Sequence, residues 1–203
     1  MDGLLDRAVH RPCARVLVRL LLRLPVSPNL VTLVGLGLGL LASWQFWHAS
    51  PGSALLGLLA YFLSSVADHA DGELARLTGR VTVFGRWLDV LADTATQILL
   101  VLGMAATASS LGGDRMLLLG ATAACGVALS ALCVNLLPPR PRPPGCTASL
   151  IDGLANRDAF YLALGAFILF LWRDARLLPG LLWVLAAGSQ AFWLAYLLQR
   201  VRS

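Results

Sequence analysis

Six long apolar stretches, separated by short polar or charged segments, dominate the hydrophobic pattern of the chain. An α-helix needs about 20 residues to cross the roughly 30 Å hydrocarbon core of a bilayer, and each stretch has this length or comes close to it. The stretches occupy residues 30–47, 53–75, 84–109, 115–137, 157–172 and 177–198. The first and the fifth are short, so tilt or flanking residues would have to supply the missing length. The pattern predicts an all-α polytopic membrane protein with six transmembrane helices.

A different periodicity precedes the first apolar stretch. Arginine recurs every four residues, with leucine and valine between, at Arg7, Arg11, Arg15, Arg19 and Arg23. On a helix this spacing is typical of an amphipathic segment that lies on an anionic membrane surface, although a charged helix in water has a similar pattern. We therefore predict an N-terminal amphipathic interfacial helix on the cytoplasmic side at residues 1–27, followed by a membrane domain at residues 28–203.

Composition agrees with an integral membrane protein. Of 203 residues, 58% are hydrophobic and 13% are charged, and we expect one membrane domain without a separate soluble module. The net charge of +5 rests on 16 arginines, because the chain has no lysine. We interpret this bias as GC-rich codon usage, hence a bacterial source, and not as a sign of nucleic-acid binding.

The arginines also predict the topology. If the N-terminus lies in the cytoplasm, 13 of the 16 fall on the cytoplasmic side. Only Arg115, Arg173 and Arg176 then lie outside, and the positive-inside rule favours this orientation. The sequence thus predicts a protein of the bacterial inner (cytoplasmic) membrane.

The strongest chemical signal lies between the second and third apolar stretches. Asp68, Asp71, Gly72, Ala75 and Arg76 are spaced to share one face of a helix, and Gly85, Asp89 and Asp93 are spaced to share one face of the next. A short turn around residues 78–80 would let the two faces meet. Carboxylates near a bilayer are costly, so this arrangement indicates a functional site that faces the cytoplasm.

Four aspartates in one site need a counter-charge. At about 6 Å and an effective dielectric constant of about 20, each pair of charges repels by roughly 3 kcal/mol. Either protons or cations must therefore accompany these groups. Oxygen donors without a histidine or cysteine cluster favour Mg²⁺, Mn²⁺ or Ca²⁺, and Mg²⁺ is the commonest choice where phosphates also bind. We predict Mg²⁺ or Mn²⁺, as two ions, with Asp68, Asp71, Asp89 and Asp93 as ligands.

The pattern D-x2-D-G-x2-A-R-x8-G-x3-D-x3-D, which is complete here, resembles the signature of the CDP-alcohol phosphatidyltransferases (class I). The segment at residues 28–32 is similar to the entry of that family's first transmembrane helix. The resemblance implies a metal-dependent enzyme that transfers a phospho-alcohol group from a CDP-alcohol to an acceptor hydroxyl and releases CMP. It further implies phospholipid or phosphoinositol-type synthesis by a homodimer, in contact with membrane lipids.

The resemblance also implies roles for particular residues. Asp93 would be the general base that takes the proton of the acceptor hydroxyl. The CDP-alcohol would contact Asp68 and the small or polar residues around it, namely Thr32, Gly72, Ala75, Arg76 and Gly85. Arg76 would supply a bidentate donor to phosphate.

The acceptor site has a weaker signal. Residues 138–149 are rich in proline and contain Arg140 and Arg142, and Arg157 follows at the start of the fifth stretch. These arginines either bind a phosphorylated acceptor, such as inositol phosphate or glycerol phosphate, or only anchor the loop at the membrane. The Arg157-Asp158 and Phe160-Tyr161 pairs resemble the branch of the family with inositol-phosphate products, while a neutral acceptor such as serine stays open.

Two other functions remain as alternatives. A membrane cation or proton transporter can also place aspartates in apolar helices, but a relay would spread them across the bilayer. An inactive, scaffold-like relative would more naturally have lost one of the aspartates. Among neighbouring polar residues, we interpret His69 as a variable position that points away from Asp68, and Gln97 as a helix-packing residue.

Overall fold

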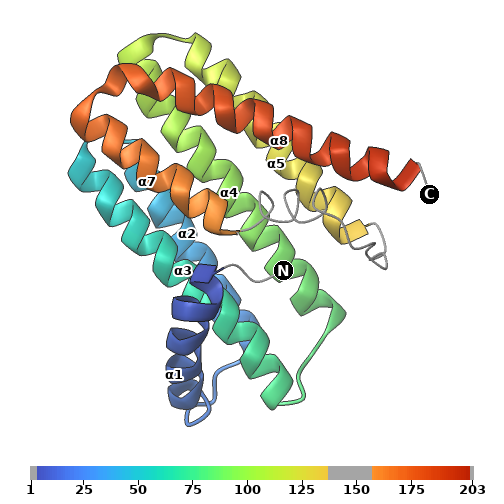
Figure 1. Cartoon of the computed structure of the whole chain (residues 1–203). Helices are drawn as coiled ribbons and strands as arrows, with labels where there is room; N and C mark the ends of the chain where they lie inside the picture. The colour runs from blue at the N-terminus through green and yellow to red at the C-terminus, as the bar shows by residue number, and fades with distance from the viewer. Residues whose placement is uncertain (1–3, 137–156, 202–203) are drawn as a thin grey trace.

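The computed structural model describes residues 4–136 and 157–201, and the part of the chain it describes contains helices and no strand. A π-helical turn, η1, precedes the first α-helix, and a short 3₁₀ turn, η2, precedes the last helix. Figure 1 shows how the α-helices are arranged. The elements are η1 (Asp6–His10), α1 (Arg11–Leu21), α2 (Pro28–Phe46), α3 (Pro51–Leu77), α4 (Val83–Gly112), α5 (Arg115–Leu136), α7 (Arg157–Arg173), η2 (Ala175–Leu177) and α8 (Leu178–Val201). The all-α prediction is confirmed.

Each predicted apolar stretch corresponds to one helix. Five helical segments in the described part are long and apolar enough to cross a membrane: Pro28–Phe46, Pro51–Leu77, Val83–Leu111, Arg115–Leu136 and Ala175–Leu198. The remaining helix, α7, has 17 residues and is therefore about 26 Å long, slightly shorter than the hydrocarbon core. The prediction of a membrane protein is thus supported by five spans, while a sixth span at α7 stays a prediction.

The six apolar helices form a ring. Contacts run from α3 to α2, α4, α5, α8 and α7 in turn, and α7 returns to α3. Leucine, valine and tryptophan side chains remain exposed on the outside of these helices, for example Leu33, Leu118 and Trp183. Such residues are expected on helix faces that contact lipid.

Small residues let the helices approach closely, as is common where helices pack in membranes. The Ser64 hydroxyl of α3 donates a hydrogen bond of 2.7 Å to the Gly35 carbonyl of α2. A Cβ atom on Gly39 would lie 2.3 Å from the Thr96 hydroxyl oxygen of α4, too close for any real contact. Helix α2 therefore packs closely on both α3 and α4, near the positions where these two helices carry the aspartates.

A glycine on α5 gives a direct test of this packing. A Cβ atom on Gly120 would lie 2.2 Å from the Cβ atom of Ala105 on α4. We expect Gly120→Ala to lower the free energy of unfolding by about 1–3 kcal/mol, because α5 must move away from α4. Thermal unfolding in detergent measures the change. The control is Gly165→Ala, since no atom lies within 4 Å of the added methyl group there; an equal loss of stability in both variants would contradict this explanation.

The N-terminal helix packs with one face on α3. Ala14 and Val18 of α1 are buried in a cluster with Ala67, Ala70 and Leu74 of α3. Outside this contact the helix exposes its arginines together with apolar side chains such as Leu20, which is 56% exposed. The helix is amphipathic, as predicted, and its location at a membrane surface stays a prediction.

Candidate active site

The end of α3 and the start of α4 are joined by a tight turn that brings their polar faces together. Helix α3 ends at Leu77, and Thr82 caps α4 by accepting a hydrogen bond of 2.9 Å from the Gly85 amide. Between them, Gly79 has a φ of 66°, a conformation that costs other residues energy because of their Cβ atom. The turn predicted around residues 78–80 is therefore present.

Three of the four aspartates line one large cavity. Asp68, Asp89 and Asp93 border an open cavity of about 780 Å³ that is lined by residues of α3, α4, α5, α7 and α8. The Asp89 carboxyl group is hydrogen bonded to that of Asp68, and Asp71 and Asp93 lie close enough for their charges to repel Asp89. A hydrogen bond between two carboxyl groups requires a proton on one of them, or a cation in its place. The site thus has the crowding expected from the sequence.

Asp71 lies deeper than the other three. It is 4% exposed and accepts a hydrogen bond from the hydroxyl of Thr32 on α2. Both residues border a second cavity of about 20 Å³, roughly the space of one water molecule or ion. Asp68 and Asp93 line both cavities and thus connect them. Helix α2 therefore contributes Thr32 directly to the aspartate cluster.

The donor set fits a hard divalent cation in its chemistry. Carboxylate oxygens from two helices, with a hydroxyl beside them, are the ligands that Mg²⁺ and Mn²⁺ prefer. Within the described residues, however, no three His, Cys, Asp or Glu side chains converge into a group that could hold a metal ion. Asp71 is turned to Thr32, and Asp93 accepts a hydrogen bond of 3.1 Å from Gln97. Helix packing brings the carboxylates near one another, and side-chain rotation would have to complete a coordination sphere.

The two glycines of the motif differ in the space around them, and only Gly85 is in a tight place. A Cβ atom on Gly72 would lie 3.6 Å from a guanidinium nitrogen of Arg76, which is exposed. On α4, a Cβ atom on Gly85 would lie 3.1 Å from the side-chain oxygen of Asn29. The half-buried Ala75 lies on α3 between these groups and the turn. The motif residues therefore share one end of the α3 and α4 pair.

Sequence reasoning missed the contacts of three polar residues. The prediction that His69 points away from Asp68 is wrong, because its Nδ1 lies 3.7 Å from Asp68 Oδ2 and the residue lines the large cavity. Gln97 is more than a packing residue, since it donates to Asp93 from the next helical turn, a contact that the i, i+4 spacing could have indicated. Asp6 also lines the cavity, and no local pattern indicates this.

The candidate acceptor-binding residues cannot be placed in the same way. Arg140 and Arg142 lie outside the described residues. Arg157 begins α7, and its side chain lies outside the described part. Asp158 and Tyr161 instead contact the N-terminal segment: Asp158 accepts a hydrogen bond of 3.2 Å from the Leu5 amide, and the Tyr161 hydroxyl lies 3.1 Å from His10 Nε2.

Away from the aspartates the large cavity is mostly apolar. Its wall there is formed mainly by valine, alanine, leucine and phenylalanine side chains from α5, α7 and α8, including Val127, Ala166, Leu185 and Phe192, with Ser130, Asn135 and Ser189 among them. One end thus has carboxylates, and the remainder can accommodate hydrocarbon. A molecule with a charged head and an apolar tail matches this distribution.

Comparisons with known proteins agree with this arrangement. A sequence model of a protein family described as CDP-alcohol phosphatidyltransferase matches residues 25–186, which is most of the chain. An archaetidylinositol phosphate synthase of Pyrococcus horikoshii is 32% identical over 97 residues, which cover 48% of this chain and 50% of that protein. A phosphatidylinositol phosphate synthase of Mycobacteroides abscessus is 32% identical over 93 residues, or 46% of this chain and 41% of that protein.

A third relative has a different name. A CDP-diacylglycerol–glycerol-3-phosphate 3-phosphatidyltransferase of Rickettsia bellii is 36% identical over 66 residues, which cover 32% of this chain and 36% of that protein. The matched part of this chain thus spans half or less of the length of these curated relatives. The similarity is strong enough to identify a family, and it leaves open which substrates this chain uses.

Proposed function

Because the chain belongs to the CDP-alcohol phosphatidyltransferase family, we propose that it transfers a phospho-alcohol group from a CDP-alcohol to an acceptor hydroxyl and releases CMP. The observation that carries this proposal is the position of Asp68, Asp89 and Asp93 at the polar end of a largely apolar cavity. In this arrangement a diphosphate can lie at the carboxylates while an apolar group extends between α5, α7 and α8.

A divalent cation, when bound by Asp68, Asp71, Asp89 and Asp93, would neutralise the diphosphate and the charge that develops on the departing CMP. Mg²⁺ or Mn²⁺, as two ions, fits this role. Arg76 lies on the same face of α3 and can donate two hydrogen bonds to phosphate. Thr32, which donates to Asp71, and the small residues Gly72, Ala75 and Gly85 are the proposed contacts of the CDP group.

Asp93 is the proposed general base. Its carboxylate is oriented by Gln97, which donates to Oδ2. The acceptor oxygen forms a bond to the phosphorus next to the alcohol, the bond from this phosphorus to CMP breaks, and the acceptor proton passes to Asp93. The products are CMP and a phosphodiester, and the proton on Asp93 leaves to solvent.

A lipid donor and a phosphorylated polyol acceptor fit this site best. The apolar walls of the cavity would hold acyl or other hydrocarbon chains of a CDP-lipid. The names of the relatives contain inositol phosphate or glycerol-3-phosphate, both phosphorylated polyols. Arg140, Arg142 and Arg157 are the proposed contacts for such a phosphate. A site in the bacterial inner membrane that faces the cytoplasm, with the basic N-terminal helix at the membrane surface and a homodimer as the assembly, completes the proposal.

A cation or proton transporter is the less favoured function. A relay needs carboxylates at successive depths, whereas these four lie in the last part of α3 and the first part of α4. The four carboxylates would therefore occupy only one end of a path for cations or protons across the membrane.

The direct test is CMP release by the full chain, purified in detergent or nanodiscs. We expect CMP from CDP-diacylglycerol together with inositol phosphate or glycerol phosphate, in the presence of Mg²⁺ or Mn²⁺ and not of EDTA. Serine and other neutral alcohols, and soluble donors such as CDP-inositol, are tested in parallel to identify the pair. Absence of CMP with every pair, although the protein binds the metal, would contradict the proposed function and favour transport or a lost activity.

A further inference from the structure

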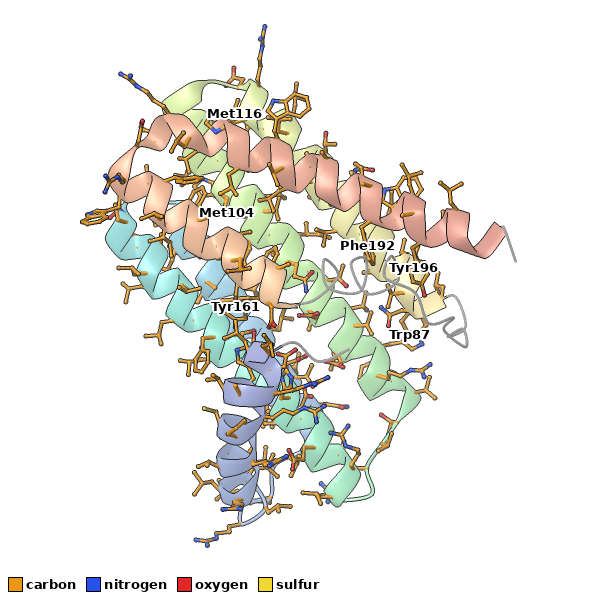
Figure 2. All side chains as sticks on the ribbon, viewed as in Figure 1. Trp87, Met104, Met116, Tyr161, Phe192 and Tyr196 are labelled. Carbon is orange, nitrogen blue, oxygen red and sulfur yellow. The ribbon has the colours of Figure 1, made fainter. Side chains whose placement is uncertain are left out.

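A closed set of polar contacts connects the N-terminal segment to the aspartate site. His10 Nδ1 lies 2.9 Å from Asp6 Oδ1, and His10 Nε2 lies 3.1 Å from the Tyr161 hydroxyl of α7. That hydroxyl donates a hydrogen bond of 2.9 Å to the Ser65 hydroxyl of α3. Figure 2 shows Tyr161 at the end of α7 nearest to the N-terminal helix. Three segments that are far apart in the sequence therefore meet at these side chains.

The set closes through His69. Its Nδ1 donates a hydrogen bond of 2.8 Å to the Ser65 carbonyl, which restrains one edge of the ring. Its Nε2 then lies 3.6 Å from Asp6 Oδ1, while Nδ1 is 3.7 Å from Asp68 Oδ2. The imidazole of His69 thus lies between two carboxylates at ion-pair distance, one from the N-terminal segment and one from the proposed metal site.

Asp6 is unusually buried for a carboxylate. It is 5% exposed, and its partner His10 is 1% exposed. Carboxylates are rarely buried unless they are paired, and here the pairing is with two histidines. Asp6 also lies in a π-helical turn, a feature that is frequent near functional sites. If the N-terminal helix served only to contact lipid, its first turn would not need a buried carboxylate that borders the active-site cavity.

We propose that Asp6 is a positioning residue for Asp68: held by His10, it orients His69 against the carboxylate that the proposed function assigns to the metal. The inference rests on that function, and it makes the N-terminal segment part of the active site. Mutation of a group that orients a metal ligand commonly lowers metal affinity or activity by about 10–100-fold. In this role Asp6 acts through His69 and is not itself a ligand of the metal.

The test is Mn²⁺ binding to the full chain in detergent, measured by electron paramagnetic resonance. We expect Asp6→Asn to raise the Kd for Mn²⁺ by about 10-fold or more. Asp158→Asn is the control, because it weakens another attachment of the same segment, at the Leu4 and Leu5 amides, without changing the surroundings of His69. The control is expected to retain the Mn²⁺ affinity of the unmodified protein. An unchanged Kd in folded Asp6→Asn, or an equal rise in both variants, would overturn the proposal.

A second variant decides the question if Asp6→Asn does not fold. His69→Gln leaves the Asp6 and His10 pair in place, and it is expected to weaken Mn²⁺ binding to a similar extent. The double variant is expected to bind no more weakly than His69→Gln, since residues that act through one another are not additive. Full affinity in His69→Gln would overturn the proposal.

The same proteins separate this inference from the proposed function. In CMP release, Asp6→Asn is expected to raise the Mg²⁺ concentration needed for half-maximal rate more than it raises the KM for the CDP-alcohol. If the unmodified protein binds Mn²⁺ but releases no CMP, the proposed function is wrong, and the Kd values of the variants for Mn²⁺ still test the role of Asp6. If the unmodified protein does not bind Mn²⁺ at all, both the proposed function and the proposed role of Asp6 are contradicted.

Discussion

Replacement of Asp93 by asparagine is expected to reduce the kcat for CMP release by about 10²–10⁴-fold, the range that a general base contributes. The amide keeps the size of the side chain and can still interact with Gln97, which now donates to the carboxylate at 3.1 Å. It cannot take the proton of the acceptor hydroxyl. Binding of the CDP-alcohol should be largely retained, because the carboxylates of Asp68, Asp71 and Asp89 remain. Steady-state kinetics and equilibrium binding of the donor measure the two effects separately.

The matched control for this change is Glu73→Gln. This variant also replaces a carboxylate by an amide. Glu73 lies on α3 at a half-buried position that lines neither cavity. We expect little change in kcat. Undiminished turnover in Asp93→Asn would rule out Asp93 as the base, and an equal loss in both variants would indicate a general effect of negative charge in this region.

The second large effect is expected at Asp89, the carboxyl group most crowded by the others. It is hydrogen bonded to Asp68 and repelled by Asp71 and Asp93. In EDTA we expect Asp89→Asn to unfold at the same temperature as the unmodified protein or a higher one, because the Asp68 and Asp89 carboxyl groups must share a proton when no cation is bound, whereas an amide at this position can donate to Asp68 without one. Added Mg²⁺ should then stabilise the unmodified protein but not the variant, since a ligand stabilises only the state that binds it.

Activity should change in the opposite direction to stability. A metal ion contributes several kcal/mol to the stabilisation of a transition state, and about 1.4 kcal/mol corresponds to a factor of ten. CMP release by Asp89→Asn is therefore expected to fall by about 10³-fold. Asp114→Asn is the control at the other end of α4, about 35 Å away at 1.5 Å per residue. If Mg²⁺ raises the unfolding temperature of Asp89→Asn as much as that of the unmodified protein, Asp89 is not a ligand.

These predictions depend on features that were already clear from the sequence. The spacing of Asp68 and Asp71, and that of Asp89 and Asp93, places each pair on one helix face, and Gly79 marks the turn between the helices. Such patterns are local, because helix geometry relates residues three or four apart in any context. For the same reason the helix bounds lie within a few residues of the apolar stretches.

One prediction from local spacing was wrong. His69 was expected to point away from Asp68, because a step of one residue turns a helix by about 100°. The side chain is long enough to return toward Asp68, and the Ser65 carbonyl one turn earlier holds it there. The Asp158 and Tyr161 side chains, for which the sequence indicated no partner, contact the N-terminal segment. In both cases the partner of a polar side chain, and not its place on the helix, determines its direction.

The sequence by itself determined the all-helical membrane architecture, the carboxylate motif and the family. Each depends on hydrophobic length or on spacing within one or two helices, which the bilayer and the backbone hydrogen bonds impose independently of the rest of the chain. Only the tertiary structure decided that Thr32 reaches Asp71 and that the cavity has an apolar wall. It alone placed Asp6 beside His69. These contacts join residues 39 or more positions apart, and they arise only when α1, α2 and α7 pack against α3.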